Sequence, residues 1–205
     1  MTKKGNVRIL GIDPGSRLCG YAFITSKSPY TISRHCIKLD DVGVIKANLN
    51  LPFGERIGLL HSTLFGLVKE LAPDIVIMED AFFGANARSA LKLGMARGAL
   101  MAAVARTGLS VIEVSPTHVK KTIAGTGAAD KEMISISLNS LIGFQRGNLP
   151  HDASDALAIA LCGVLLHQTP TIAAKKTNAT SNTPLTHLLS EQQESVDKNP
   201  ARGNV

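Results

Sequence analysis

Residues 7–13, VRILGID, decide the fold that this sequence predicts. Their apolar side chains indicate a short buried strand, which ends on Asp13 directly before the turn residues PGSR. A second apolar run follows at residues 18–25, so the two runs predict a β-hairpin. A carboxylate at the end of a buried strand loses hydration. Asp13 therefore either only starts a turn or belongs to a cationic or catalytic site.

Strand and helix patterns alternate along the following residues. Loose alternation predicts a third antiparallel strand at 30–39, and apolar runs predict two more strands at 74–79 and 109–114. Apolar residues at helical spacing predict helices over 52–71, 87–105, 118–123, 131–141 and 152–167. Asn86 and Ser115 are the predicted N-caps, with Pro116 at the first helical position after Ser115. The sequence therefore predicts the α/β class, with a mixed five-stranded sheet flanked by α-helices.

Length and composition predict one domain followed by a polar tail. The chain has 205 residues, which is enough for a single α/β domain, and we assign residues 1–167 to it. Residues 168–205 are rich in Thr, Asn, Ser, Gln and Pro and contain no aromatic residue. Such a segment buries too little apolar surface to offset its conformational entropy, so we expect a mostly disordered tail.

The charge balance favours a polyanionic partner. Lys and Arg total 22 against 16 Asp and Glu, which gives a formal net charge of +6. A basic surface suits nucleic acid, although many small soluble proteins are also basic. Three cysteines without CxxC spacing argue against a disulfide framework or a zinc site. No signal peptide or membrane span is apparent, so we expect a cytoplasmic protein.

Three further carboxylates lie where apolar runs begin or end. Glu79 closes DIVIMED, and Asp152 and Asp155 open the helical stretch HDASDALAIALCGVLL. Acids at a helix start are also favoured by the helix dipole, but two of them three residues apart repel each other. Together with Asp13 they suggest a site for a pair of hard divalent cations, which prefer oxygen ligands. His151 is a ligand, a proton shuttle or simply a residue at the helix start.

Basic and aromatic residues supply candidate contacts to nucleic acid. Lys120 and Lys131 each lie beside a glycine-containing turn and are candidates for phosphate contacts, as are Arg88 and Lys92 in the preceding predicted helix. Phe82 follows Glu79 closely and is either a core residue or a wedge that stacks on a base.

Four blocks of sequence resemble one family in the expected order. They are ILGIDPGS, IVIMED with F-x-x-x-N-x-x-S-A-L-K-L-G-x-A-R-G, VKKTIAG, and D-x-x-D-A-L-A-I-A, which together span residues 7–162. This pattern resembles RuvC, the bacterial Holliday junction resolvase family. The resemblance implies an RNase H-like fold, a homodimer, and Mg²⁺-dependent cleavage of four-way DNA junctions.

The resemblance also implies roles for individual residues. The catalytic and metal-binding carboxylates would be Asp13, Glu79, Asp152 and Asp155. Two Mg²⁺ ions, for which Mn²⁺ can substitute, would act from both sides of the phosphate, and paired nicks would leave 5′-phosphate and 3′-hydroxyl ends. Phe82 would lie near the strand-exchange point, and Lys120 and Lys131 near the scissile phosphate. The RuvA and RuvB branch-migration proteins would be partners.

Two other functions remain open at this stage. An ATPase or phosphotransferase of the actin and sugar-kinase type also has Asp-x-Gly-Ser after a first strand. That class needs a second domain and a second phosphate loop, and residues 125–131, GTGAADK, do not match a P-loop. The other alternative is a junction-binding protein that has lost catalysis, against which the four retained acids argue.

Overall fold

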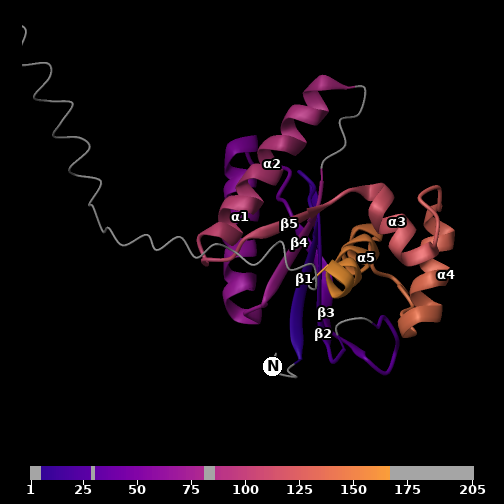
Figure 1. Ribbon diagram of the computed structural model, residues 1–205. Coiled ribbons are helices and arrows are strands. Elements are labelled where there is room, and N and C mark those ends of the chain that lie inside the picture. Colours follow the sequence, from indigo (N-terminus) through magenta and orange to yellow (C-terminus); the bar gives the residue numbers. More distant parts are fainter. Residues whose placement is uncertain (1–5, 29–30, 81–85, 167–205) are drawn as a thin grey trace, which may run out of the picture. The chain divides into compact units, whose positions relative to one another are not determined.

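The computed structural model of the chain describes residues 6–28, 31–80 and 86–166. They belong to the first of two units, Met1–Thr171, while the predicted tail lies outside the described residues. Five strands and five helices are described (Figure 1). In chain order they are β1 (Val7–Asp13), β2 (Leu18–Ser26), β3 (Ile37–Lys46), α1 (Phe53–Leu71), β4 (Ile75–Glu79), α2 (Ala87–Ala105), β5 (Val111–Val114), α3 (Pro116–Ala124), α4 (Lys131–Ile142) and α5 (His151–Leu166).

The strands form one mixed sheet in the order β3-β2-β1-β4-β5. β1 and β2 form the predicted antiparallel hairpin and β3 extends it, whereas β4 and β5 run parallel to β1 and to each other. The prediction of a mixed five-stranded sheet is confirmed. Because Ile12 pairs with Met78 in the parallel ladder, the next residues, Asp13 and Glu79, lie at the same edge of the sheet.

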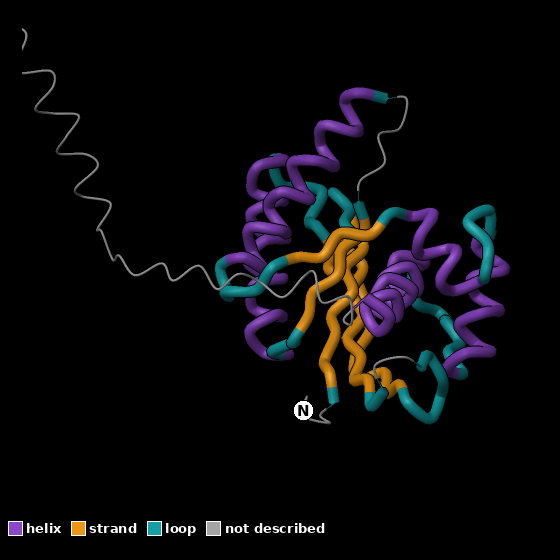
Figure 2. The backbone as a smooth tube through the Cα atoms, in the orientation of Figure 1, coloured by secondary structure: helices purple, strands orange, loops and turns teal. Residues whose placement is uncertain are grey.

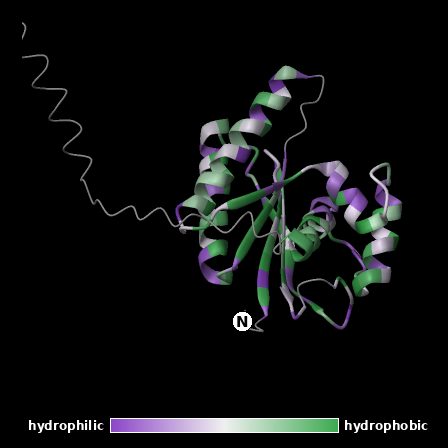
Figure 3. Cartoon of the chain, in the orientation of Figure 1, coloured by the Kyte–Doolittle hydropathy of each residue, from purple (hydrophilic) through white to green (hydrophobic). Residues whose placement is uncertain are grey.

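Helices cover both faces of the sheet, which gives three layers (Figure 2). Successive strand residues point to opposite faces. Ile9 and Ile77 therefore pack in a core cluster with α3, α4 and α5, whereas Leu10, Ile12 and Met78 pack in a second cluster with α1 and α2. The central strands accordingly read as nearly continuous hydrophobic runs (Figure 3), as expected for strands buried on both faces.

Two glycines allow α5 to lie directly on the sheet. A Cβ atom on Gly11 would come within 2.3 Å of the Ala156 carbonyl oxygen and 2.4 Å of the Ala160 nitrogen. A Cβ atom on Gly20 would come within 2.0 Å of the Asp152 carbonyl oxygen. Only glycine permits so close an approach, so these positions determine where the first turn of α5 lies.

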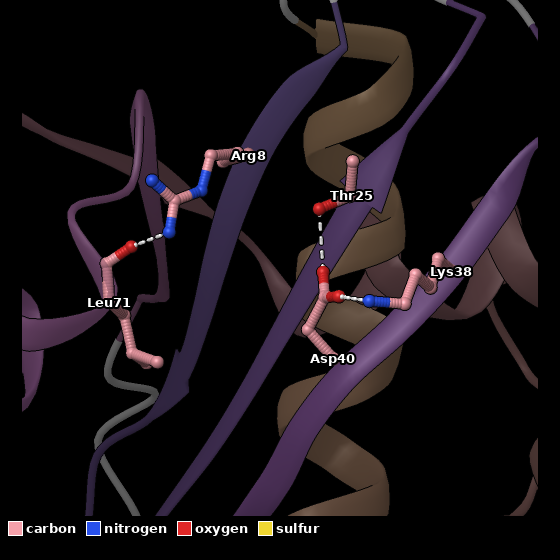
Figure 4. A network of polar contacts seen from close by, with 5 residues as sticks. All are labelled: Arg8, Thr25, Lys38, Asp40 and Leu71. Carbon is pink, nitrogen blue, oxygen red and sulfur yellow. Dashed lines mark hydrogen bonds and ion pairs between the residues drawn. The ribbon is translucent and has the colours of Figure 1, made fainter.

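The third strand differs from its prediction. It spans Ile37–Lys46 rather than 30–39, and it pairs with β2 from Ser26↔Ile37 to Leu18↔Lys46. Asp40 lies inside this edge strand because its carboxylate accepts hydrogen bonds from Thr25 Oγ1 at 2.6 Å and Lys38 Nζ at 2.5 Å (Figure 4). The same view shows Arg8 of β1 donating to the Leu71 carbonyl at the end of α1.

The predicted N-caps are confirmed. The Asn86 side chain accepts a hydrogen bond from the Ser89 nitrogen, and the Ser115 side chain accepts one from the His118 nitrogen. α3 begins at Pro116, the first helical position predicted after the Ser115 cap, and ends at Ala124, one residue beyond the predicted end. The other helix boundaries lie within one residue of their predicted positions. No helix among the described residues has both the length and the apolar character to cross a bilayer.

Candidate functional site

Three separate elements bring the four carboxylates to one place. Asp13 ends β1 and Glu79 ends β4, whereas Asp152 and Asp155 lie in the first turn of α5, which packs across β1, β2 and β4. All four side chains are half-buried. The electrostatic field of each of the other three acts on Asp13. The fold therefore brings the four acids that the sequence singled out close to one another.

Burial and mutual repulsion raise the proton affinity of this cluster. Burial, reinforced by the charges of Glu79, Asp155 and Asp152, raises the pKa of Asp13 to about 8. The pKa of Glu79 is raised by burial and by Asp155. The pKa of Asp155 is also raised, chiefly by burial. A carboxylate cluster in this state is stabilised by any cation that it admits.

The donor set fits hard divalent cations. It consists of carboxylate oxygens alone, the ligands that Mg²⁺ and Mn²⁺ prefer. No three His, Cys, Asp or Glu side chains in residues 6–28, 31–80 and 86–166 already form a closed set of metal ligands. The charges of the other three acids nevertheless all raise the pKa of Asp13. A cation placed among the four carboxylates would offset this repulsion.

Two lysines border the carboxylates on the side of α3 and α4. A cavity of about 160 Å³, which we call the Lys120–Lys131 cavity, is lined by both lysines together with Glu79 and Asp155. Lys131 Nζ lies 4.0 Å from Asp155 Oδ2. The charge of Lys120 opposes the pKa rise of Glu79 and Asp155. The structure thus places both predicted lysines beside the acidic cluster.

His151 and Arg146 extend the basic border. They line a cavity of about 360 Å³ with Lys131 and Asp155. The Arg146 guanidinium donates to the Leu149 carbonyl, which ties it to the loop before α5. His151 is exposed at the first position of α5, and its charge opposes the pKa rise of Asp155. His151 is therefore a neighbour of the carboxylates, and its role stays open.

Of the other residues predicted to contact DNA, Arg88 and Lys92 do not line these two cavities. Arg88 is exposed in the first turn of α2. Lys92 is half-buried with its Nζ 5.8 Å from the centroid of the Phe53 ring on α1. Phe82 lies outside the described residues.

Sequence reasoning did not single out a second basic surface that lies next to the carboxylates. A larger cavity, of about 600 Å³, opens beside Asp152 and is lined by Arg17 and Lys46. These two residues are far apart in the sequence and become neighbours only through the pairing of β2 with β3. The sequence offered only a weak signal, an arginine as the last residue of the turn that follows Asp13.

Comparisons with known proteins agree with one another. The family model described as crossover junction endodeoxyribonuclease RuvC matches residues 9–163. Relatives named crossover junction endodeoxyribonuclease RuvC include one from Caldicellulosiruptor saccharolyticus, 36% identical over 78% of this chain and 93% of the relative. Another, from Chlorobaculum parvum, is 40% identical over 75% of this chain and 79% of the relative.

Solved structures show the same fold. The structure described as Thermus thermophilus RuvC in complex with Holliday junction substrate matches with a TM-score of 0.69 and 28% identity, over 78% of this chain and 94% of that chain. The yeast mitochondrial Holliday junction resolvase Ydc2 matches with a TM-score of 0.54 at 17% identity, over 75% of this chain and 76% of that chain, which supports the fold alone. The fold is RNase H-like, and the chain belongs to the RuvC family of crossover junction endodeoxyribonucleases.

Proposed function

We propose that this protein is a structure-specific endonuclease that resolves four-way DNA junctions in recombination and repair by paired, symmetric nicks. The observation that carries the proposal is the meeting of Asp13, Glu79, Asp152 and Asp155 at one edge of the sheet. Family membership supplies the substrate, since the relatives are named crossover junction endodeoxyribonucleases and one solved relative is described with a Holliday junction.

The four carboxylates are proposed as the ligands of two Mg²⁺ ions, which Mn²⁺ can replace. When bound, such ions polarise the phosphodiester and stabilise the attacking and leaving oxygens. The chain contributes the placement of its own groups. β1 and β4 hold Asp13 and Glu79 rigidly, and the glycines under α5 fix the height of Asp152 and Asp155 above the sheet. Hydrolysis in this geometry would leave a 5′-phosphate and a 3′-hydroxyl.

Lys120 and Lys131 are proposed to hold the scissile phosphate against the carboxylates. Both line the cavity that also contains Glu79 and Asp155, so a phosphate there would meet positive charge on one side and the acidic cluster on the other. This arrangement orients the DNA and limits repulsion between the phosphate and the acids. Arg88, Lys92 and Phe82 remain predicted DNA contacts that rest on the sequence and the resemblance.

A homodimer would place two such sites on the two-fold symmetric junction. An open face of α2 supports this part of the proposal. Leu91 is 66% exposed and Met95 is 48% exposed. Gly94 and Gly98 share this face, and no atom lies within 4 Å of a Cβ built on either. An apolar helix face with small residues suits close packing against a second copy of the same helix.

The other proposed partners and the proposed location rest on fewer observations. Association with the RuvA and RuvB branch-migration proteins remains a prediction from the family resemblance. The proposed location is the cytoplasm, because the proposed substrate is chromosomal DNA.

The direct test incubates the full chain and Mg²⁺ with a synthetic mobile four-way junction and with linear duplex of the same sequence. We expect symmetric nicks in the junction, products that DNA ligase can reseal, intact duplex, and no cleavage in EDTA. Equal cleavage of both substrates would contradict the junction specificity. ATP hydrolysis without nicking would instead support the phosphotransferase alternative, and junction binding without nicking would support a non-catalytic binding protein.

A further inference from the structure

The largest cavity described above lies against the carboxylate centre on the side away from Lys120 and Lys131. We call it the Arg17–Lys46 cavity; it is lined by Gly15, Ser16, Arg17, Leu18, Lys46, Ala47, Leu49 and Asp152, and its volume is about 600 Å³. Asp152 borders this cavity, while Asp155, three residues further along α5, borders the Lys120–Lys131 cavity. A strand of DNA held at the carboxylates therefore has a basic surface on both flanks.

The sheet fixes the two basic residues of this cavity beside each other. Leu18 pairs with Lys46 in the antiparallel ladder between β2 and β3, and the Ala47 nitrogen donates to the Arg17 carbonyl oxygen at 2.9 Å. Arg17 and Lys46 thus occupy diagonal backbone positions at one end of the β2–β3 ladder, and both line the cavity. The ladder therefore fixes the spacing of their backbones at the rim of this cavity.

Neither positive charge is neutralised within the described part of the chain. Arg17 and Lys46 are both exposed, and no ion pair or side-chain hydrogen bond joins either one to another described residue. Arg97, by contrast, is held by Asp80 and Glu113. The lining of the cavity carries these two cations and a single carboxylate, Asp152, so its net charge is positive and attracts an anion to Arg17 and Lys46.

The wall of the cavity is apolar. Leu49 is 48% exposed, although it is a large hydrophobic residue, and Leu18 and Ala47 complete the wall beside it. A cationic rim over an apolar wall matches a sugar-phosphate unit, whose phosphate needs positive charge and whose deoxyribose offers an apolar face. A free inorganic anion would leave the apolar wall exposed to water.

We propose that the Arg17–Lys46 cavity seats a nucleotide of the strand being cut, with its phosphate on Arg17 and Lys46 and its sugar against Leu49. This inference rests on the proposed nuclease function and adds a second anchoring point to it. β3 lies two strands from β1, about 10 Å away. The seated phosphate is therefore within about three nucleotides of the cut, at a rise of about 3.4 Å per nucleotide along the axis of B-DNA. Anchors on both flanks hold the scissile bond in place over the carboxylates.

The test compares the full-length double variant Arg17→Gln/Lys46→Gln with Lys27→Gln/Arg34→Gln. The control removes the same two charges from exposed residues in the connection at the opposite end of the β2–β3 pair. Junction affinity in EDTA is measured against salt concentration. We expect the Arg17/Lys46 variant to bind roughly tenfold more weakly and to lose about 0.9 from the salt slope for each phosphate contact removed, whereas the control keeps the wild-type slope.

Single methylphosphonate substitutions near the cut locate the contact. A neutral phosphate at the seated position should slow cleavage by the wild type and by the control but not slow the Arg17/Lys46 variant further. The variant Arg17→Lys/Lys46→Arg, which keeps both charges, should restore the salt slope. Unchanged thermal unfolding would show that the losses come from DNA contacts and not from the fold.

The outcomes separate this inference from the proposed function. The Arg17/Lys46 variant could match the control in affinity and salt slope while the wild type nicks junctions. That result would contradict the proposed nucleotide seat and leave the nuclease function standing. Sensitivity of that variant to every methylphosphonate would also overturn the seat. A wild-type protein that neither binds nor nicks junctions would overturn both.

Discussion

Helices α5 and α2 lie on opposite faces of the same sheet and differ in how completely they are enclosed. In α5, residues 156–164 are all buried, and its backbone touches β1 at Gly11. In α2 only Ala96, Leu100, Ala103 and Val104 are buried, and its glycines meet open space. The enclosed helix carries two of the candidate catalytic acids, whereas the open helix carries none of them.

This difference separates two requirements of a junction nuclease. Metal ligands must keep their positions to within a fraction of an ångström, which favours a helix that packing holds on all sides. Association with a second copy instead needs an apolar face that the domain itself leaves uncovered. We therefore expect changes around α5 to affect chemistry and folding, and changes on the open face of α2 to affect assembly.

The largest expected effect is on the chemistry next to α5. Asp13→Asn should lower the rate of junction cleavage on the order of 10³-fold, the loss typical of removing one electrostatic stabiliser at a reacting centre. Junction binding in EDTA should remain, because the basic surface is unchanged. Asp80→Asn is the matched control, since Asp80 lies beside Glu79 and contacts Arg97 at 3.4 Å. A rate for Asp13→Asn that matches the control would remove Asp13 from the catalytic set.

A pair of glycine substitutions tests the packing contrast directly. Gly11→Ala forces a Cβ atom into the backbone of α5 and should destabilise the protein by about 1–3 kcal/mol. At about 2–4 °C per kcal/mol, the thermal midpoint should fall by several degrees. Gly66→Ala meets open space on α1, which packs on the same face of the sheet as α2, and should leave the midpoint unchanged or slightly higher, because alanine favours helix. Equal midpoints for the two variants would show that α5 can shift away from the sheet.

The sequence predicted the acidic cluster better than its surroundings, and the reason is physical. Asp13 and Glu79 interrupt apolar runs, which is a local signal, and parallel pairing of those runs then brings the two acids together. The residues of β3 gave a misleading pattern, because Asp40 and Asp41 resemble a turn until the partners Thr25 and Lys38 are known. Arg17 and Lys46 become neighbours only through strand register, which local patterns do not specify.

A single charge introduced on the open face of α2 should prevent a second copy from packing there. Leu91→Glu should convert the proposed dimer into a monomer, since a carboxylate buried at a helix contact has no partner there. Sedimentation equilibrium measures the mass, and a junction-extrusion assay distinguishes single from paired nicks. Leu59→Glu on α1, at another exposed leucine, is the control and should stay dimeric. A dimeric Leu91→Glu protein would place the interface elsewhere.

The smallest expected effect is the folding stability that the protein loses when the carboxylate cluster ionises without a bound metal. The pKa of Asp13 is about 8 in the folded protein against an ordinary 3.8, so the folded state holds the proton more tightly than the unfolded chain. The resulting stability is fully present below about pH 4 and is lost as the pH rises toward 8. In EDTA the thermal midpoint of the wild type should therefore fall between pH 5 and pH 8, and the midpoint of Asp13→Asn should fall less. At pH 8 the free energy of unfolding of Asp13→Asn should exceed that of the wild type by ~1 kcal/mol or more.

Mg²⁺ should reduce this pH dependence in the wild type. A cation takes the place of the protons that the cluster would otherwise retain, so its stabilising effect should be larger at pH 8 than at pH 5. Asp13→Asn should show a smaller Mg²⁺ effect at both values. Parallel curves of midpoint against pH for the two proteins in EDTA would mean that Asp13 ionises in the folded protein without loss of stability. Burial beside α5 would then not raise its pKa.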